Sequence, residues 1–208
     1  MRASSFASGA TAGTALKSAL SMGADEAILF HDPLTESVDQ QGIAYLLAKM
    51  IQKTGAYDLV LTGCMSGDWG DGAVPAFVAE ELGIGCVSFV SRIEVTDGQM
   101  MMRRLVEDGY ELTQAKTPVL ASIISDETNT PRYPKLKDIM AAGKRTIPVW
   151  KAADLDLDPG RIGAAAVKVA IADVYIPMKE SKCEMIEGET PGEQAAKLAA
   201  RLRDLKLI

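Results

Sequence analysis

The 208-residue sequence has few of the residues on which metal, disulfide and hydrolytic sites depend. It contains one histidine, His31, and three cysteines, Cys64, Cys86 and Cys183, which form no CxxC pair. This scarcity argues against a zinc knuckle and a disulfide framework, because both need paired ligands at short spacing. We therefore expect the cysteines to be small core residues in a reducing, cytoplasmic compartment, and His31 to lie in a surface loop.

Basic residues and long apolar runs are also scarce. Lys and Arg number 22 against 28 Asp and Glu, which gives a formal net charge of −6 at pH 7. Without a basic excess the chain is poorly suited to a phosphate backbone, so no nucleic-acid partner is expected. No apolar run approaches the roughly 20 residues of a membrane helix, so no membrane insertion is expected either.

Several catalytic motifs are missing as well. The sequence has no GxSxG, no GxGxxG and no P-loop, so neither serine hydrolysis nor a standard dinucleotide or triphosphate site is supported. Asp68 and Asp71 could suggest a magnesium site, but solvated acids in a turn are the favoured interpretation. We predict no catalytic residues and no metal site.

Unbroken apolar strands that alternate with amphipathic helices are what the sequence does contain. Helices are predicted at 14–22, 40–54, 73–82 and 136–142, and strands at 27–30, 59–63, 85–95, 99–106, 110–115 and 119–124. This alternation is typical of an α/β fold with an open, mostly parallel sheet. A hairpin turn at Asp97-Gly98 and a second turn at Asp108-Gly109 predict added antiparallel strands. The run Met100-Met101-Met102 in this hairpin is expected to pack in the core.

The turn between strand 59–63 and helix 73–82 gives the clearest signal for a binding site. Gly67, Gly70 and Gly72 let the backbone approach a ligand, and a helix N-terminus offers amides to an anion. Ligands of open α/β sheets bind beyond the carboxyl ends of the strands. An equally weighted alternative is a plain glycine-rich connection in which Asp71 caps the helix.

The C-terminal part of the chain predicts an arm and a helix. Residues 146–173 are irregular or extended and include the apolar segment 167–171. Thr190, Pro191 and Glu193 then form a capping-box pattern before a helix with an apolar face. We expect residues 1–154 to form the α/β domain and residues 155–208 to form an arm and helix for subunit docking.

Five segments resemble the β subunit of electron transfer flavoproteins. They are ALKSALSMGADEAILFHD (15–32), YDLVLTG (57–63), RRLVEDGYELTQAKTPVLAS (103–122), NTPRYPKLKDIMAAGKRTIPVWKAADLDLD (129–158) and the final ETPGEQAAKLAARLRDLKLI (189–208). The Asn-x-Pro-Arg-Tyr-Pro-x-Leu run in the fourth segment is the most specific. The resemblance implies a sheet of the adenine-nucleotide α-hydrolase-like type.

The resemblance also implies a function. A β subunit of this kind pairs with an α subunit that holds FAD, and the pair carries electrons between acyl-CoA-type or other flavin dehydrogenases and an acceptor. It is a carrier component rather than a self-sufficient enzyme. The β subunit itself binds AMP, or a second FAD in electron-bifurcating members.

Motif by motif, the resemblance assigns residues to two roles. Nucleotide-binding positions fall on Ala7, Gly63, Cys64, Ser66, Asp68, Asp71, Gly72, Ala73 and Val74. The stretch from Ala7 to Gly9 falls where an earlier strand end borders the nucleotide. The partner-docking loop falls on Arg132, Tyr133 and Leu136, and Leu136 matches the leucine that anchors into a dehydrogenase.

The sequence departs from the family in four places. Ala73 replaces a glutamine that contacts the nucleotide, Trp69 replaces a small or acidic residue, and Leu105 replaces a glutamate. Family members also begin with a further strand–helix–strand unit, which ends roughly where Met1 begins here. Any nucleotide is therefore expected to bind weakly.

Two other functions were weighed. One is a stand-alone adenine-nucleotide-binding module without a redox role, which would need neither the docking loop nor the arm. The other is a nucleotide pyrophosphate hydrolase, but the Ser-Gly-Gly-Lys-Asp loop that it requires is missing.

Overall fold

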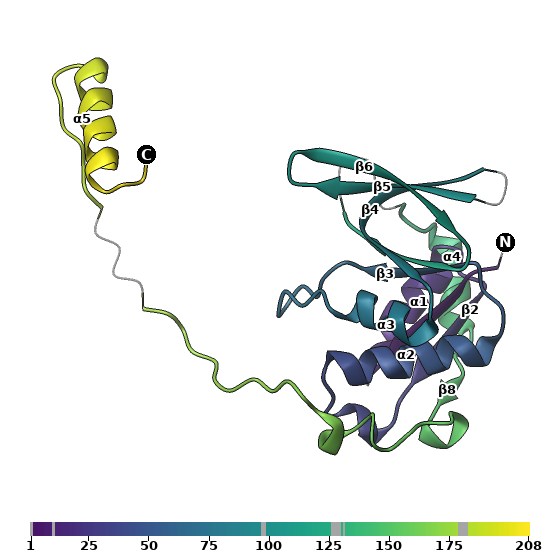
Figure 1. Ribbon diagram of the computed structural model, residues 1–208. Coiled ribbons are helices and arrows are strands. Elements are labelled where there is room, and N and C mark those ends of the chain that lie inside the picture. Colours follow the sequence, from purple (N-terminus) through teal and green to yellow (C-terminus); the bar gives the residue numbers. More distant parts are fainter. Residues whose placement is uncertain (1, 10, 97–98, 126–129, 131, 179–182) are drawn as a thin grey trace. The chain divides into compact units, whose positions relative to one another are not determined.

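The structure is a computed structural model that describes residues 2–9, 11–96, 99–125, 130, 132–178 and 183–208 (Figure 1). The chain divides into two compact units, residues 1–170 and residues 171–208. Leu155 and Ile162 are buried in the core of the first unit, so the chain after Asp154 still packs with it. The turn expected at Asp97-Gly98, and Asn129 and Pro131 of the specific motif, lie outside the described residues.

A small parallel sheet opens the first unit. It has the order β1-β2-β8, formed by β1 (Ser4–Ser8), β2 (Glu26–Phe30) and β8 (Val149–Trp150). Helix α1 (Gly13–Ser21) joins β1 to β2. The apolar pattern did not predict β1, because its sequence SSFAS has only one large apolar side chain, Phe6.

A second sheet has the order β3-β7-β4-β5-β6. Its strands are β3 (Leu59–Gly63), β4 (Gly85–Thr96), β5 (Gln99–Val106), β6 (Gly109–Lys116) and β7 (Val119–Ile123). β3, β7 and β4 run parallel, whereas β5 and β6 are antiparallel additions. The predicted α/β fold with mostly parallel strands and an antiparallel hairpin is confirmed. Met100 and Met102 are buried, as expected.

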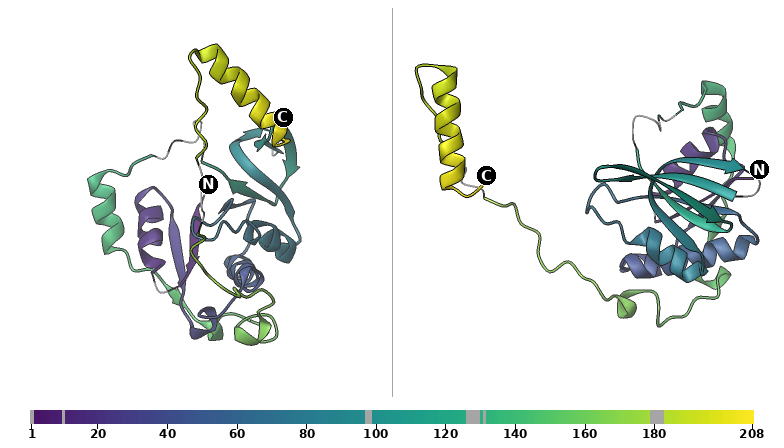
Figure 2. Two further views of the ribbon diagram at one scale, coloured as in Figure 1. Left: turned by 90° about the vertical axis from the view of Figure 1, so that its left-hand side faces the viewer. Right: turned by 45° about the horizontal axis from the view of Figure 1, so that its top comes forward.

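Helix α2 (Gln40–Thr54) packs against both sheets. Its residues Tyr45, Leu46 and Met50 join the cluster around β2, and Ala44 and Ile51 join the cluster around β3 and β7. Helix α3 (Val74–Leu82) contributes to the second cluster. In Figure 2, α2 and α3 lie along the same face of the strands. One helix layer therefore serves two sheets.

The opposite face of the small sheet is covered by α1 and α4 (Leu136–Lys144). Leu16 and Leu20 of α1, Ala27 of β2 and Ala142 of α4 form this cluster. The Lys17 ammonium donates hydrogen bonds of 3.0 Å to the carbonyls of Ala142 and Gly143. It thereby satisfies carbonyls at the C-terminal end of α4, where a cation is favoured.

Three short 3₁₀ helices complete the first unit: Pro33–Thr35, Ala152–Asp154 and Ala164–Ala166. The second unit contains α5 (Pro191–Asp204). The Thr190 hydroxyl accepts from the Glu193 N–H at 3.2 Å, as the capping box predicts. The Glu193 carboxylate accepts from the N–H of Glu189 at 3.0 Å. In the described part of the chain, no helix is long and apolar enough to span a membrane.

Candidate nucleotide loop and docking surface

The glycine-rich loop after β3 is closed by its own hydrogen bonds. The Ser66 N–H donates to the Asp71 carbonyl at 2.8 Å, and the Asp71 N–H donates to the Ser66 hydroxyl at 3.1 Å. A glycine suits position 72, because a Cβ there would lie 3.1 Å from the Cys64 carbonyl oxygen, a tight contact. The predicted residues from Gly63 to Val74 are thus gathered into one turn.

The N-terminus of α3 faces the end of this loop. Its N-cap residue, Ala73, has no side chain that caps the helix. The Asp71 carboxylate instead accepts the N–H of Ala73, the N-cap residue, at 2.9 Å. Asp71 therefore caps the start of the helix, as the alternative interpretation expected, but it binds the N-cap residue and not the first turn. The first backbone bond of the helix runs from the Phe77 N–H to the Ala73 carbonyl. The N–H groups of Val74 and Ala76 therefore have no acceptor within the helix, and Pro75 has no N–H to offer. The start of this helix therefore offers few N–H donors to an anion.

Asp68 lies at the exposed tip of the loop. The N–H of Trp69 donates to its carboxylate at 2.8 Å. This bond, followed by one from the Ser66 side chain, lowers the pKa of Asp68 from its ordinary value. Asp68 is therefore a carboxylate at neutral pH, suited to accept hydrogen bonds from ribose hydroxyls and unsuited to sit beside a phosphate.

Two residues with unpaired hydroxyls lie at the carboxyl ends of strands: Ser8, inside the expected stretch from Ala7 to Gly9, and Thr62, which sequence reasoning missed. The hydroxyls of Ser8 on β1 and Thr62 on β3 are buried and have no hydrogen-bond partner among the described residues. Buried hydroxyls are nearly always paired, so these two are free to meet a further polar group. Thr62 precedes Gly63 at the end of β3, and that glycine is the local signal that could have identified it.

Ala7 is placed differently from the rest of the predicted nucleotide set. It lies on β1 opposite Leu29 and packs against the cluster of α1 and α4. Its side chain therefore contributes to packing on the small sheet. The loop residues belong to the second sheet, and the two hydroxyls stand at the ends of the strands that border the two sheets.

The predicted docking residues lie just before and at the start of α4, and all three are exposed. Tyr133 is 93% exposed and Leu136 is 73% exposed. The expectation that the Leu136 side chain lies outside the core is confirmed. Ile139 and Met140 on the same helix are also exposed, and they extend this apolar surface beyond what the motif indicated. Their helical spacing from Leu136 is the signal that would have found them.

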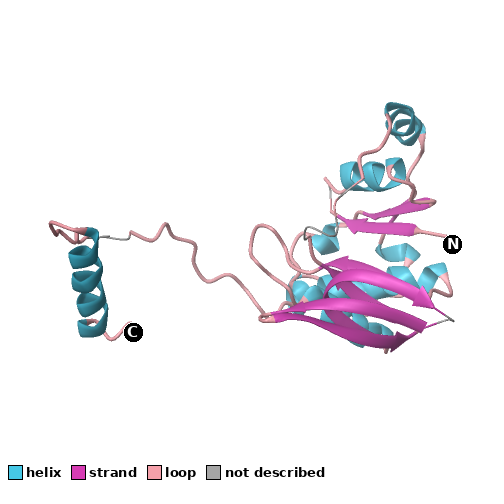
Figure 3. Ribbon diagram, turned by 90° about the horizontal axis from the view of Figure 1, so that it is seen from above, coloured by secondary structure: helices cyan, strands magenta, loops and turns pink. Residues whose placement is uncertain are grey.

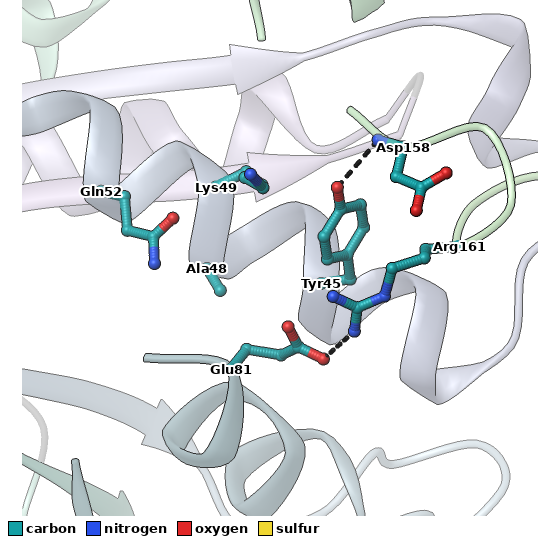
Figure 4. A pocket seen from close by; sticks show the side chains of 7 residues that line it. All are labelled: Tyr45, Ala48, Lys49, Gln52, Glu81, Asp158 and Arg161. Carbon is teal, nitrogen blue, oxygen red and sulfur yellow. Dashed lines mark hydrogen bonds and ion pairs between the residues drawn. The ribbon is translucent and has the colours of Figure 1, made fainter. Parts of the chain in front are cut away.

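A surface pocket of about 350 Å³ lies away from both predicted sites, between α2, the end of α3 and the segment after Asp154 (Figure 4). The guanidinium of Arg161 lies 4.3 Å from the centre of the Tyr45 ring and pairs with Glu81. The Tyr45 hydroxyl accepts the N–H of Asp158 at 2.8 Å. These contacts fasten residues 158–161 onto two helices, and two acids balance the two cations that line the pocket. The polar side chains of this pocket are thus used to hold the chain after Asp154 in place.

The cysteine prediction is wrong. Cys86 and Cys183 are exposed, Cys64 is half-buried, and all three are unpaired. Cysteine's small side chain gives no amphipathic signal, so its burial could not be read from the pattern. His31 is exposed, as expected. Among the described residues, no group of three His, Cys, Asp or Glu side chains could hold a metal ion.

Comparison with known proteins identifies the family. The profile for the electron transfer flavoprotein domain matches residues 5–155. The chain is 34% identical over 195 residues to an electron transfer flavoprotein subunit beta of Thermoanaerobacterium thermosaccharolyticum, covering 93% of this chain and 74% of the relative. It is 32% identical to subunit CarD of the caffeyl-CoA reductase-Etf complex of Acetobacterium woodii, covering 93% and 73%. It is 34% identical to the subunit beta of Bacillus subtilis, covering 90% and 71%. The chain therefore belongs to the electron transfer flavoprotein family.

Proposed function

We propose that the chain works as the β-type component of an electron transfer flavoprotein. The observation that carries this proposal is its similarity to β subunits over about nine-tenths of its length. It acts as an electron carrier component, joined to an FAD-holding α subunit, between a flavin dehydrogenase and an acceptor. Its three unpaired cysteines support a cytoplasmic location.

The nucleotide of this component, AMP or FAD, would be held by the loop after β3. Its fold is then of the adenine-nucleotide α-hydrolase-like type. The Val74 N–H would meet a phosphate, Asp68 would accept from a ribose, and the unpaired hydroxyl of Thr62 would meet a polar group of the ligand. FAD supplies electron-carrying chemistry when bound, whereas AMP supplies none. The residues fit one phosphate better than two, because Asp68 and Asp71 add negative charge beside the helix end.

The α subunit would be met by the chain after Asp154. Ile176 and Met178 are almost fully exposed, and α5 has no buried residue among its own. An apolar arm and an uncovered amphipathic helix are expected of a segment that is buried by a partner. A stand-alone nucleotide module would have no use for either, so the structure does not favour that alternative.

A dehydrogenase would be met by the surface formed by Tyr133, Leu136, Ile139 and Met140. A leucine and an aromatic side chain projecting from a polar segment are typical anchors of an interface. Arg132 beside them is exposed and suited to an acidic partner.

Co-expression of the chain with the α subunit of its source organism tests the proposal. We expect a one-to-one complex that contains flavin and accepts electrons from a reduced flavin dehydrogenase. Mass spectrometry of the small molecules released on denaturation identifies AMP or FAD. A chain that stays monomeric beside a folded α subunit, and leaves the α subunit's flavin unreduced by the dehydrogenase, would contradict it.

A further inference from the structure

The segment from Ala152 to Val169 is fastened to the first unit along α2, and we call it the anchored segment. Near the C-terminal end of α2, the Lys53 ammonium donates to the Asp154 carbonyl. Closer to the start of the helix, the Tyr45 hydroxyl accepts the N–H of Asp158 at 2.8 Å. The anchored segment therefore follows α2 from its C-terminal end towards its N-terminal end (Figure 1).

Asp39 makes the last of these attachments, and its two carboxylate oxygens have different partners. Oδ1 accepts from the Gly42 N–H at 3.0 Å and so caps α2. Oδ2 accepts from the N–H groups of Lys168 and Val169 at 2.7 and 3.3 Å. The residue is 9% exposed, so water competes little for either oxygen. A helix cap needs one side-chain oxygen, and the second oxygen is thus given to the end of the anchored segment.

Asp32 makes a similar pair of contacts at the beginning of the anchored segment. Its Oδ1 accepts from the Leu34 N–H at 3.1 Å, at the start of a 3₁₀ helix, and its Oδ2 accepts from the Ala152 N–H at 3.0 Å. These contacts lie at the end of the segment that is remote from the arm. Asp32 therefore serves as a matched control for Asp39.

The attachment stops where the apolar arm begins. The first compact unit ends at residue 170, and residues 170–178 are all exposed. In Figure 3 the described chain between the anchored segment and α5 is drawn as loop. Within the described residues, the bonds from Lys168 and Val169 to Asp39 are therefore the last that tie the chain to the first unit before the arm.

Holding the root of an arm changes how well the arm binds a partner that the first unit also contacts. With the Asp39 bonds intact, only Ala170 separates the held Val169 from the exposed apolar Ile171. Without them, the last buried large side chain is Ile162, and residues 163–170 all lie between it and the arm. Effective concentration falls with about the −3/2 power of linker length, so this lengthening lowers it roughly tenfold.

We propose that Asp39 is a positioning residue for subunit assembly. Its Oδ2 fixes the point from which the arm leaves, so that the first unit and the arm meet the α subunit together. The inference rests on the proposed pairing with an α subunit, and it assigns to one buried carboxylate a role beyond capping α2.

Titration of the full 208-residue chain with the flavin-loaded α subunit of its source organism tests this role. Asp39→Ser keeps a hydroxyl that caps α2, but this single short oxygen leaves the Lys168 and Val169 N–H groups without an acceptor. We expect the Kd for the α subunit to rise about tenfold. Asp32→Ser removes the equivalent bond at Ala152 and should change the Kd less than twofold.

The donor side gives an independent variant. Lys168→Pro removes the N–H that lies 2.7 Å from Asp39, and Val167, at φ −61° and ψ 124°, already has a conformation that suits a following proline. It should weaken binding as much as Asp39→Ser does. Lys168→Gln removes the charge, keeps the N–H and should bind like the wild type.

Combining the two changes separates a positioning role from general destabilisation. Asp39→Ser and Lys168→Pro remove the same bond, so the double variant should have nearly the Kd of either single variant. Hydrogen exchange at the Val169 N–H should speed up in Asp39→Ser and stay as in the wild type in Asp32→Ser.

The outcomes distinguish this inference from the function on which it rests. A wild-type chain that does not bind the α subunit overturns the proposed function and this inference with it. Tight binding by the wild type and by Asp39→Ser alike overturns only the role of Asp39. Equal weakening by Asp32→Ser and Asp39→Ser also overturns it, because the loss would then not depend on the root of the arm.

Discussion

Among single residues, Asp39 connects the start of α2 to Lys168 and Val169, which lie 129 and 130 residues later in the sequence. Its carboxylate accepts from the Gly42 N–H at 3.0 Å, which caps α2, and from the N–H groups of Lys168 and Val169 at 2.7 and 3.3 Å. One buried carboxylate thus holds both the start of α2 and the segment at Lys168 and Val169, where the C-terminal arm begins. A polar side chain in such a position is costly to remove, because its partners are left unpaired.

Asp39→Ala is therefore expected to lower the free energy of unfolding by about 2–4 kcal/mol, from one lost cap and two lost charge-assisted bonds. Asp39→Asn should cost less, because asparagine still caps the helix. Urea unfolding of the three proteins checks the order. Equal midpoints for wild type and alanine variant would show that the carboxylate contributes nothing.

The same carboxylate predicts a dependence of stability on pH. Burial alone would raise the pKa of Asp39, but the N–H donors of Lys168, Gly42, Val169 and Gln41 outweigh it and lower the pKa from 3.8. The N–H groups of Ala152 and Leu34 likewise lower the pKa of Asp32. A pKa lowered by folding adds stability above pH 3.8, and this stability is lost as the pH falls through the folded-state value.

We expect Asp32→Asn and Asp39→Asn each to reduce the fall in the free energy of unfolding between about pH 5 and pH 2. Each variant removes one carboxyl group whose pKa is lowered by folding. Urea midpoints measured across that range check it. An unchanged slope in both variants would mean that other carboxylates control acid unfolding.

Leu136 separates a docking role from a packing role. Because its side chain is largely exposed, Leu136→Ala should change the free energy of unfolding by less than about 0.5 kcal/mol. A buried leucine would cost about 2–5 kcal/mol. The variant should slow electron transfer from the dehydrogenase, whereas Leu112→Ala should change neither property. Stopped-flow reduction and thermal unfolding give the two readouts.

At the scale of elements, α5 has no buried residue in the described structure. Leu198 and Leu205 are exposed on one face, and the helix is held by its Thr190 cap and an ion pair between Lys197 and Glu193. We expect Leu198→Asp to abolish co-purification with the α subunit, whereas Ala200→Asp on the opposite side should keep it. Equal retention of both variants would show that α5 is not part of the subunit interface.

Local sequence predicted the elements whose signals are local. Helix α2 begins and ends where the apolar spacing and Gly55 indicated, since Asp39 caps its start and Gly55 adopts a positive φ of 96° at its end. Strand β1 gave no such signal, because its sequence SSFAS has only one large apolar side chain. The position of the loop after β3 was predictable from its glycines.

The rest of the site depends on contacts between residues distant in sequence. The hydroxyls of Ser8 and Thr62 are informative only because both lack partners, and the Tyr45 and Arg161 side chains meet across more than a hundred residues. Whether a polar side chain is paired is decided by the whole fold. The sequence pattern therefore predicts where the loop lies, but it does not predict which distant residues contact it.

At the scale of the molecule, the two sheets share no hydrogen bonds in the described structure, and α2 couples them through apolar contacts. Leu47 packs against both clusters. We expect Leu47→Ala to cost about 2 kcal/mol and to separate the unfolding of the two sheets. In a Trp69→Phe background, Trp150 fluorescence reports the small sheet, and circular dichroism reports the whole chain.

In the parent background the fluorescence and circular dichroism transitions should coincide, and with Leu47→Ala they should diverge. Coincident transitions in both proteins would mean that the first unit remains one cooperative block without this contact.

The arm segment from Ile171 to Met178 has a consequence for the behaviour of the chain at high concentration. It is rich in exposed β-branched and aromatic side chains, with Asp173 as its one charged residue. Short segments of this composition are templates for intermolecular strand stacking. Pro177 cannot donate a ladder hydrogen bond, so it limits how far such a stack extends. The solubility of the chain then depends on two rates. If the arm is covered by a partner faster than two arms meet, the chain stays in solution, and if two arms meet first, it aggregates.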